Sequence, residues 1–164
     1  MAAYGEPFPG TRDDKIQRIE QLPGDLARTV AGLTDAQLDT PYRAGGWTVR
    51  QVVHHLADSH INAYMRVKLL LTEDTPTIKP YDQDGWAALA DARTLPVFVS
   101  LALLGPLHVR FAAAFRDAKP GDWGRTAIHP DWGPLSLHQF LDEYARHGHH
   151  HLEQIAQLKQ SKGW

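Results

Sequence analysis

The chain has 164 residues, a formal net charge of -2, 43% hydrophobic residues and 22% charged residues. This length and composition fit one globular domain, residues 1–164, that can bury its own core. The nearly balanced charge argues against nucleic acid and anionic membrane surfaces as partners. Because the chain contains no cysteine, disulfides, a thiol nucleophile and thiolate metal sites are excluded, and any metal ligand must be nitrogen or oxygen.

The N-terminal sequence MAAYGEPFPG has no basic segment followed by an apolar run, so no secretory signal is predicted there. The longest apolar stretch, residues 95–107, is interrupted by Pro96, Ser100, Gly105 and Pro106. Such interruptions argue against a membrane-spanning helix. We therefore expect a cytoplasmic protein that does not associate with membranes.

The first long helix is predicted over residues 12–33. Thr11 followed by Asp14 has the spacing of a capping box, in which each side chain bonds the backbone of the other residue. Pro23 and Gly24 fall inside the segment, and a proline removes one helical hydrogen bond. We expect the helix to be broken or kinked at this point.

The second long helix, from Val49 to about Leu71, has the clearest start. Thr48 and Gln51 form a capping box, and Trp47 and Val52 have the spacing of a hydrophobic staple, an apolar contact across the helix start. The segment before Thr72 keeps apolar residues at three- and four-residue steps, which is typical of an amphipathic helix.

The last long helix repeats this signature. Ser136 and Gln139 form the capping box of a helix predicted from Leu137 to about Lys159. Gly148 lies inside it and is expected to weaken the helix by about 1 kcal/mol relative to alanine.

The third long helix, about Val97 to Ala118, is expected to be kinked or to start late because of Gly105-Pro106. Short helices are predicted in residues 34–38 and 86–90, and a minor hairpin in residues 124–135. No longer alternating pattern predicts a sheet. The sum is an all-α four-helix bundle.

Four histidines fall within residues 147–151. A purification tag would lie outside the structural pattern, whereas this run is followed by Leu152, Ile155 and Leu158 at helical spacing. The histidines therefore belong to the fold. Both a histidine-rich, pH-sensitive surface and half of a metal site remain open at this point.

The direction of each histidine follows from an advance of about 100° per helical residue. On the second helix, His55 lies on the flank of the apolar stripe, His60 lies inside the stripe, and His54 points away from it. On the last helix, His151 points into the apolar face and His147 lies along its edge. We interpret His60 as a hydrogen-bonded core residue rather than a ligand, and His54 as solvated.

His147 and His151 have the i, i+4 spacing that lets two imidazoles bind one ion, while His149 points to the opposite side. We interpret His149 and His108 as solvated. A third imidazole from His55 would give three nitrogen ligands, the number found in catalytic zinc sites that keep one position open.

A resemblance supports the same three residues. GGWTVRQVVHHLADSHINAY and the later HGHHHLEQI resemble the DinB-like superfamily, and within it the YfiT group, whose members are provisionally named metal-dependent hydrolases. The similarity extends over nearly the whole chain. It implies a four-helix bundle, a homodimer, and a divalent metal held by His55, His147 and His151.

The expected activity is hydrolysis of a small-molecule substrate, with water activated by the metal as the nucleophile. No residue stands out as a general base, and the catalytic residues are unknown. Asp58 and Glu143 could orient the ligand histidines from behind, although solvated surface carboxylates are the alternative reading for both. Tyr64, Trp86, Trp123 and Trp132 could line a pocket or belong to the core.

Three alternatives stay open. The same metal could activate a small-molecule thiol such as bacillithiol for S-transfer, as in relatives within the superfamily. The chain could be a non-catalytic metal- or ligand-binding protein of a stress response, or a helix bundle without metal. Zinc is the expected ion because it commonly occupies hydrolytic three-histidine sites, and nickel is the second choice because imidazole binds it as well.

Overall fold

The computed structural model describes residues 6–164, so half of the N-terminal segment discussed above lies outside the described residues. The long helices are α1 (Arg12–Val30), α3 (Val49–Thr72), α6 (Phe98–Arg116) and α7 (Leu137–Lys162). The short elements are α2 (Asp35–Leu38), α4 (Gln83–Ala87), α5 (Ala90–Thr94), the 3-10 helix η1 (Pro120–Gly124), β1 (Thr126–His129) and β2 (Gly133–Ser136).

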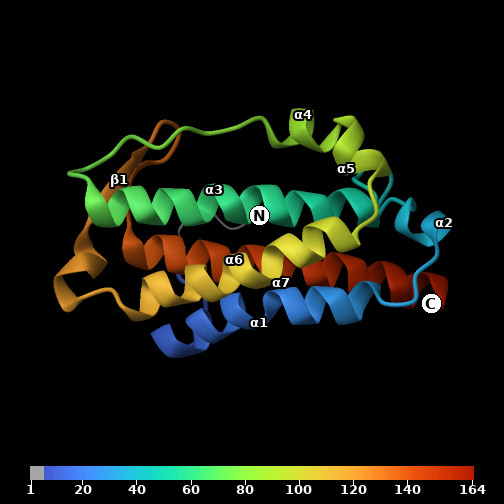
Figure 1. Ribbon diagram of the computed structural model, residues 1–164, viewed down its shortest axis with the longest axis horizontal. Coiled ribbons are helices and arrows are strands. Elements are labelled where there is room, and N and C mark those ends of the chain that lie inside the picture. The colour runs from blue at the N-terminus through green and yellow to red at the C-terminus, as the bar shows by residue number, and fades with distance from the viewer. Residues whose placement is uncertain (1–5) are drawn as a thin grey trace.

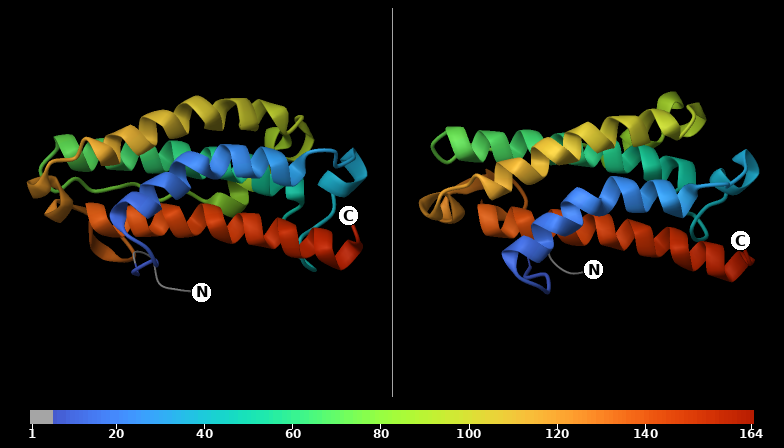
Figure 2. Two further views of the ribbon diagram at one scale, coloured as in Figure 1. Left: turned by 90° about the horizontal axis from the view of Figure 1, so that it is seen from below. Right: turned by 60° about the horizontal axis from the view of Figure 1, so that its bottom comes forward.

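The four long helices lie side by side and form the predicted four-helix bundle (Figures 1 and 2). α1 packs against α6 and α7, and α3 packs against the same two helices. The first and last long helices of the chain are therefore neighbours, and α7 also contacts α3. This arrangement brings residues of α3 and α7, far apart in sequence, to one interface.

The capping boxes form as predicted. At the start of α3 the Gln51 backbone N–H donates to Thr48 Oγ1 at 3.2 Å, and the Thr48 N–H donates to Gln51 Oε1 at 2.9 Å. The same reciprocal pair joins Ser136 and Gln139 at the start of α7. These bonds satisfy backbone N–H groups that have no partner within a helix and fix where both helices begin.

Two prolines lie inside continuous helices. α1 continues through Pro23 and bends (Figure 2), so the prediction of a kink is confirmed and that of a break is wrong. α6 begins at Phe98 and continues through Pro106, so of the two expected outcomes, a kink or a late start, the late start is wrong. Packing against neighbouring helices stabilises both segments even though each proline removes a hydrogen bond.

The connection from α3 to α6 contains two short helices, α4 and α5, where one was predicted. The hairpin of β1 and β2 is confirmed, with Thr126 opposite Ser136. The preceding loop is fastened to this hairpin, because the Ile78 N–H donates to the Ile128 carbonyl at 2.9 Å. The loop from Glu73 to Asp82 is thereby held against the hairpin, at one end of the bundle.

A layer of histidines separates two apolar clusters in the core. One cluster includes Phe111 and Phe140, and the other includes Leu26 and Leu56. Along α3, α6 and α7 the change from one cluster to the other occurs at His60, at His108 and at residues 147–151. An imidazole buried in the middle of a bundle destabilises the fold unless its ring nitrogens have polar partners.

Within residues 6–164, α6 is the one helix long and apolar enough to cross a membrane by length and composition, and 33% of its apolar window is buried. Its inner face packs against α1 and α3. A bundle helix of this composition meets the same two criteria as a membrane span, so the expected lack of membrane association stays a prediction.

Candidate metal centre

Three histidines converge where α3 faces α7. Nε2 of His55 lies 3.2 Å from Nε2 of His147, and the ligand atoms of His55, His147 and His151 all lie within 4.8 Å of one another. The i, i+4 spacing on α7 places the rings of His147 and His151 4.6 Å apart. The structure thus brings together the three residues selected from the sequence.

The geometry and chemistry of this group fit a divalent cation. Two nitrogens bound to one tetrahedral zinc at about 2.0–2.1 Å would lie about 3.3 Å apart, and the observed separation for His55 and His147 is 3.2 Å. Three neutral imidazoles supply no negative charge, so an ion held by them retains its full charge and strong polarising power.

Burial keeps these imidazoles in the form that binds metal. It lowers the pKa of His55 to about 3 and that of His151 to about 4. The pKa of His147 lies well below its usual value, first because of burial and then because of the neighbouring imidazoles of His151 and His55. All three are neutral at pH 7, so metal binding there requires no proton to be removed from them.

The centre opens towards a cavity of about 380 Å³ through His147, which is partly exposed. Trp132 lines this cavity, which confirms it as a pocket-lining aromatic. The cavity is also lined by polar side chains, those of Ser59, Arg66, Tyr81, Gln83, His129, Asp131 and Glu143. A small molecule in this cavity would lie beside the His147 ring. The arrangement suits a site with one accessible face.

The other three aromatic candidates lie elsewhere. Tyr64 lines a different cavity, next to Arg110. Trp86 is exposed and contacts the Tyr81 ring, with 4.6 Å between centroids. Trp123 is buried in the core against Phe115. Of the four aromatic candidates taken from the sequence, Trp132 is the one that lines the cavity beside the histidines.

Two of the three histidines have partners at their outer ring nitrogens. Nδ1 of His151 lies 2.8 Å from Oε1 of Gln154, and Nδ1 of His147 lies 3.2 Å from Nε2 of His60. His60 is fully buried and hydrogen-bonded, in agreement with its interpretation as a core residue. Such partners orient metal-binding imidazoles, and here they are an amide and an imidazole.

The two carboxylates proposed for this role have other contacts. Glu143 pairs with Arg146 and lines the cavity that His147 reaches. Asp58 is half-buried, and burial together with the nearby Asp91 raises the pKa of Asp58 to about 6. A role for Asp58 or Glu143 in orienting the histidines stays a prediction.

Trp47 is a residue of the site that the sequence pattern assigned only to the helix start. Its ring centroid lies 4.5 Å from that of His55 and 6.5 Å from that of His151, with its plane within 17° of the latter ring. The indole therefore covers two of the three imidazoles. The available signal was the position of Trp47 directly before the capping box of α3, which places it two helical turns before His55.

Two histidines predicted to be solvated are buried, so those predictions are wrong. His54 contacts Ser100 Oγ at 2.7 Å and the Leu95 carbonyl at 3.1 Å. His108 contacts His60 at 3.0 Å. For His54 the error arose because α3 is covered on two sides, with α5 and α6 packing over the face that His54 presents. His108 is buried because it lies on the side of α6 that faces α3 and α1. His149, by contrast, is partly exposed and pairs with Glu153.

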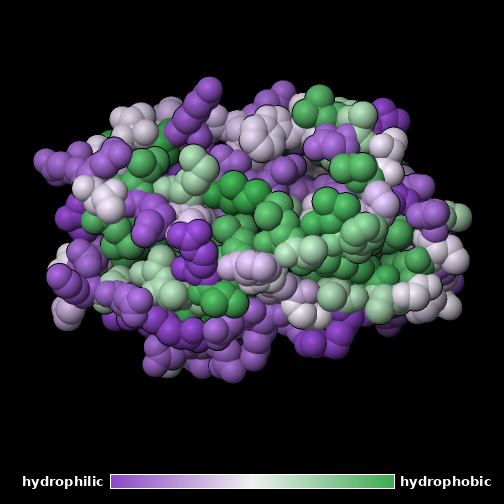
Figure 3. All heavy atoms as spheres, in the orientation of Figure 1, coloured by the Kyte–Doolittle hydropathy of each residue, from purple (hydrophilic) through white to green (hydrophobic). Residues whose placement is uncertain are grey.

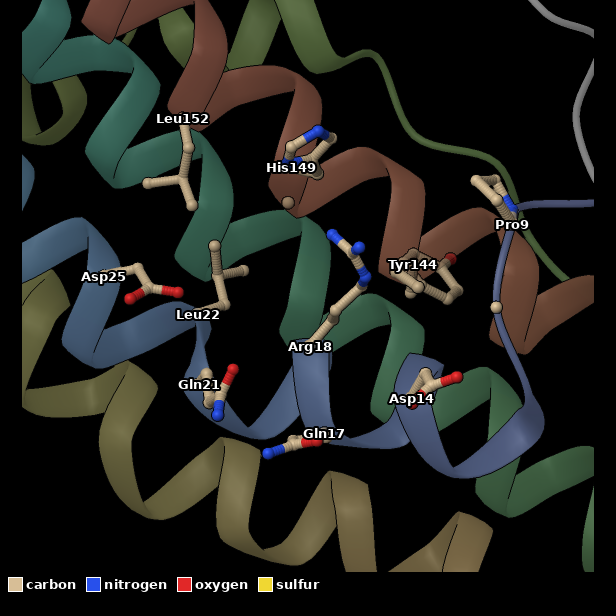
Figure 4. A pocket seen from close by; sticks show the side chains of 13 residues that line it. Pro9, Asp14, Gln17, Arg18, Gln21, Leu22, Asp25, Tyr144, His149 and Leu152 are labelled. Carbon is tan, nitrogen blue, oxygen red and sulfur yellow. The ribbon is translucent and has the colours of Figure 1, made fainter.

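A larger cavity, about 460 Å³, lies between α1 and α7 (Figure 4). Its described lining includes Arg18, Asp25, Gly148 and His149, and none of the three converging histidines. Volume alone therefore does not identify the cavity that serves the metal centre. The smaller cavity is the one that His147 reaches.

Comparisons with known proteins identify the family. The family model described as the DinB superfamily matches residues 18–155. A relative from Oceanobacillus iheyensis, provisionally named a metal-dependent hydrolase, is 52% identical over 149 residues, covering 91% of this chain and 86% of the relative. YfiT from Bacillus subtilis, which carries the same provisional name, is 49% identical over 154 residues, covering 93% of this chain and 86% of YfiT.

The solved structure of YfiT from Bacillus subtilis, described as having an unusual four-helix bundle topology, superposes with a TM-score of 0.92 at 45% identity, covering 96% of this chain and 95% of that chain. Family match, sequence identity and fold agree over nearly all of the chain. The chain therefore belongs to the DinB superfamily and is similar to YfiT-type proteins within it.

Proposed function

We propose that the protein is a metal-dependent hydrolase of a small-molecule substrate, with His55, His147 and His151 as the ligands of one divalent ion. The observation that carries this proposal is the convergence of three neutral imidazoles beside a cavity. The Nε2 atoms of His55 and His147 lie 3.2 Å apart. The provisional names of close relatives support the same class of activity.

A bound ion would supply Lewis acidity, which polarises a carbonyl group and lowers the pKa of water towards neutrality. The chain contributes the positions. His55 and His151 are buried beneath Trp47, whereas His147 faces the cavity where a substrate could approach. The chain thus covers the group of three histidines on the Trp47 side and places His147 at the cavity.

The cavity offers groups that can orient a polar substrate. Burial raises the pKa of Tyr81 to about 12, so its hydroxyl keeps its proton at neutral pH and can donate a hydrogen bond. Arg66 donates to the Lys79 carbonyl at 2.9 Å and to the Tyr144 hydroxyl at 3.2 Å, which fixes the guanidinium in the cavity wall. Tyr81 and Arg66 are therefore the proposed substrate-binding groups.

The test is an activity screen of protein loaded with zinc, and separately with nickel, against esters and amides and against electrophiles with added bacillithiol. The matched control is the His151→Ala variant treated identically. Metal-dependent hydrolysis that is lost in the variant supports the proposal. Turnover confined to the thiol panel would replace it with thiol S-transfer, and stoichiometric metal without any turnover would favour a binding protein.

We also propose that the protein is a homodimer, because α6 presents a continuous apolar outer face. Apolar side chains gather over this helix in the space-filling view (Figure 3), and Phe98, Leu103 and Val109 are each at least 47% exposed. Apolar surfaces of this kind commonly mark contacts with other chains. Light scattering should give twice the monomer mass for the wild type and the monomer mass for Leu103→Glu; a monomeric wild type would contradict the proposal.

A further inference from the structure

A chain of contacts leads from His147 across the bundle to the backbone of α1. Nδ1 of His147 lies 3.2 Å from Nε2 of His60. Nδ1 of His60 lies 3.0 Å from Nε2 of His108, and the planes of these two rings are within 12° of parallel. Nδ1 of His108 lies 2.5 Å from the carbonyl oxygen of Ile19. The contacts join all four long helices.

The carbonyl at the end fixes the direction of every hydrogen bond in this chain. A carbonyl oxygen only accepts, so Nδ1 of His108 must carry a proton, and in a neutral ring Nε2 is then an acceptor. Nδ1 of His60 must therefore donate to His108, which leaves Nε2 of His60 as an acceptor. Nδ1 of His147 must donate to it in turn, and the lone pair of His147 is left on Nε2.

That nitrogen is the one that faces the proposed metal position. Nε2 of His147 lies 3.2 Å from Nε2 of His55, and only a nitrogen without a proton can bind a metal ion. His60 and His108 are 0% and 1% exposed, so water does not readily replace their partners. The other tautomer of His147 would point a proton at the ion.

The sequence explains why the Ile19 carbonyl is available. In an α-helix the carbonyl of residue 19 accepts from the N–H of residue 23, but residue 23 is proline, which has no N–H. The carbonyl inside the bend of α1 therefore lacks its helical donor. An unpaired buried carbonyl is costly, and His108 of α6 satisfies it.

We propose that His60 and His108 are positioning residues that hold His147 in the tautomer able to bind metal, anchored by the carbonyl that Pro23 leaves unpaired. This inference rests on the proposed metal centre and adds two residues to it. No change of net charge is involved, since each ring keeps one proton and only the nitrogen that carries it is fixed.

The first test uses the unaltered, metal-free protein. Long-range proton–nitrogen correlation spectra of protein labelled with ¹⁵N-histidine report which ring nitrogen carries the proton. We expect the proton on Nδ1 in His60, His108 and His147. A proton on Nε2 of His147 in this state would overturn the inference, whatever the protein catalyses.

The second test compares variants at two buried histidines that both contact a backbone carbonyl. His108→Phe removes the acceptor of His60. The hydrogen bond between His60 and His147 can then reverse, which places the His147 proton on Nε2. His54→Phe is the matched control, because His54 also contacts a carbonyl, that of Leu95, but lies outside the relay. His108→Gln is the conservative variant, since its amide oxygen can still accept from His60.

Zinc affinity, measured by competition with a chromophoric chelator, should fall about tenfold or more in His108→Phe but about threefold or less in His108→Gln and His54→Phe. Equal losses in His108→Phe and His54→Phe, or no loss in either, would overturn the inference. If the wild type itself bound no stoichiometric metal, the metal centre would fail instead, a result distinct from a wrong tautomer.

Discussion

His54 and His55 are adjacent on α3, and both are buried, yet they belong to different kinds of environment. On one side of the helix, His54 contacts the Ser100 hydroxyl at 2.7 Å and the Leu95 carbonyl at 3.1 Å, which occupies both ring nitrogens. On the other side, Nε2 of His55 faces Nε2 of His147 at 3.2 Å. Burial lowers the pKa of both rings.

The difference shows that neither burial nor a lowered pKa identifies a metal site. His54 has both properties, but its nitrogens already have partners that a metal would have to displace. At His55 the facing groups are further imidazoles, those of His147 and His151, and one ion could bind all three rings. Convergence of three imidazoles in one place is the feature that separates the two sides.

The largest expected effect is a separation of metal binding from stability. His55→Phe should weaken zinc binding by about 100-fold or more because one of three ligands is lost. His54→Phe should leave binding nearly unchanged but lower the free energy of unfolding by about 1–3 kcal/mol, since the buried Ser100 hydroxyl loses its partner, whereas the Leu95 carbonyl keeps its bond from Arg50. Elemental analysis and urea unfolding measure the two quantities; loss of metal in both variants would contradict the comparison.

Acid should affect both sides of α3. Burial lowers the pKa of His108 from 6.5 to about 4, so the unfolded chain binds protons at higher pH than the folded one. The associated stabilisation is complete above pH 6.5 and is lost as the pH falls towards 4. For His108 alone, the lowered pKa corresponds to a loss of roughly 3 kcal/mol in the free energy of unfolding at acid pH. The lowered pKa values of His54 and His55 act in the same direction.

Urea unfolding of metal-free protein between pH 7.5 and pH 4.5 checks this expectation. Saturating zinc should move acid unfolding to lower pH, because zinc binds the folded state. His54→Phe should reduce the pH dependence of the metal-free protein while keeping the zinc effect. A free energy of unfolding that stays constant over this range would count against the lowered pKa values.

Tight packing on the metal side gives the next effect. A Cβ at Gly148 would lie 2.6 Å from Cδ2 of Leu22, so Gly148→Ala should lower the free energy of unfolding by about 1–3 kcal/mol despite a gain of about 1 kcal/mol in helix propensity. Leu22→Ala should relieve the clash. The double variant should therefore lose less than the sum of the single losses, as measured in a double-mutant cycle; simple additivity would contradict the clash.

The smallest effect is expected at Asp58, whose pKa burial raises from 3.8 to about 6. A raised carboxyl pKa means that the charged form is destabilising, fully so above pH 6 and not at all below about pH 4. After allowance for its exposure, Asp58→Asn should stabilise the protein at pH 7 by about 1 kcal/mol, or about 2–4 °C in melting temperature. Zinc affinity should stay unchanged; a tenfold loss would instead support a role for Asp58 behind the ligands.

Local sequence signals predicted the helices well. Thr48 with Gln51 and Ser136 with Gln139 gave the starts of α3 and α7, because a capping box depends on residues within one turn. The positions of His55, His147 and His151 on their helical faces followed from helical periodicity. The pairing of these faces across the bundle was supported by the resemblance to known proteins.

Other features of the site had no local signal. His54 and His108 were read as solvated, because the sequence alone does not show that α5 and α6 cover the His54 side of α3, or that His108 of α6 faces α1 and α3. Trp47 was read only as part of a helix start, although its ring lies over His55 and His151. Pro23 was read as a break or a kink, whereas its consequence for the Ile19 carbonyl depends on the presence of His108.

The sequence by itself determined where the long helices start, which faces are apolar and which histidines share a face, since these depend on neighbours within a few residues. Only the tertiary structure decided which ring nitrogens meet and which already have hydrogen-bond partners. The physical reason is that a hydrogen bond or a metal site requires atoms within about 2–3 Å. Distances of that size between α1, α3, α6 and α7 are fixed by packing of the whole bundle.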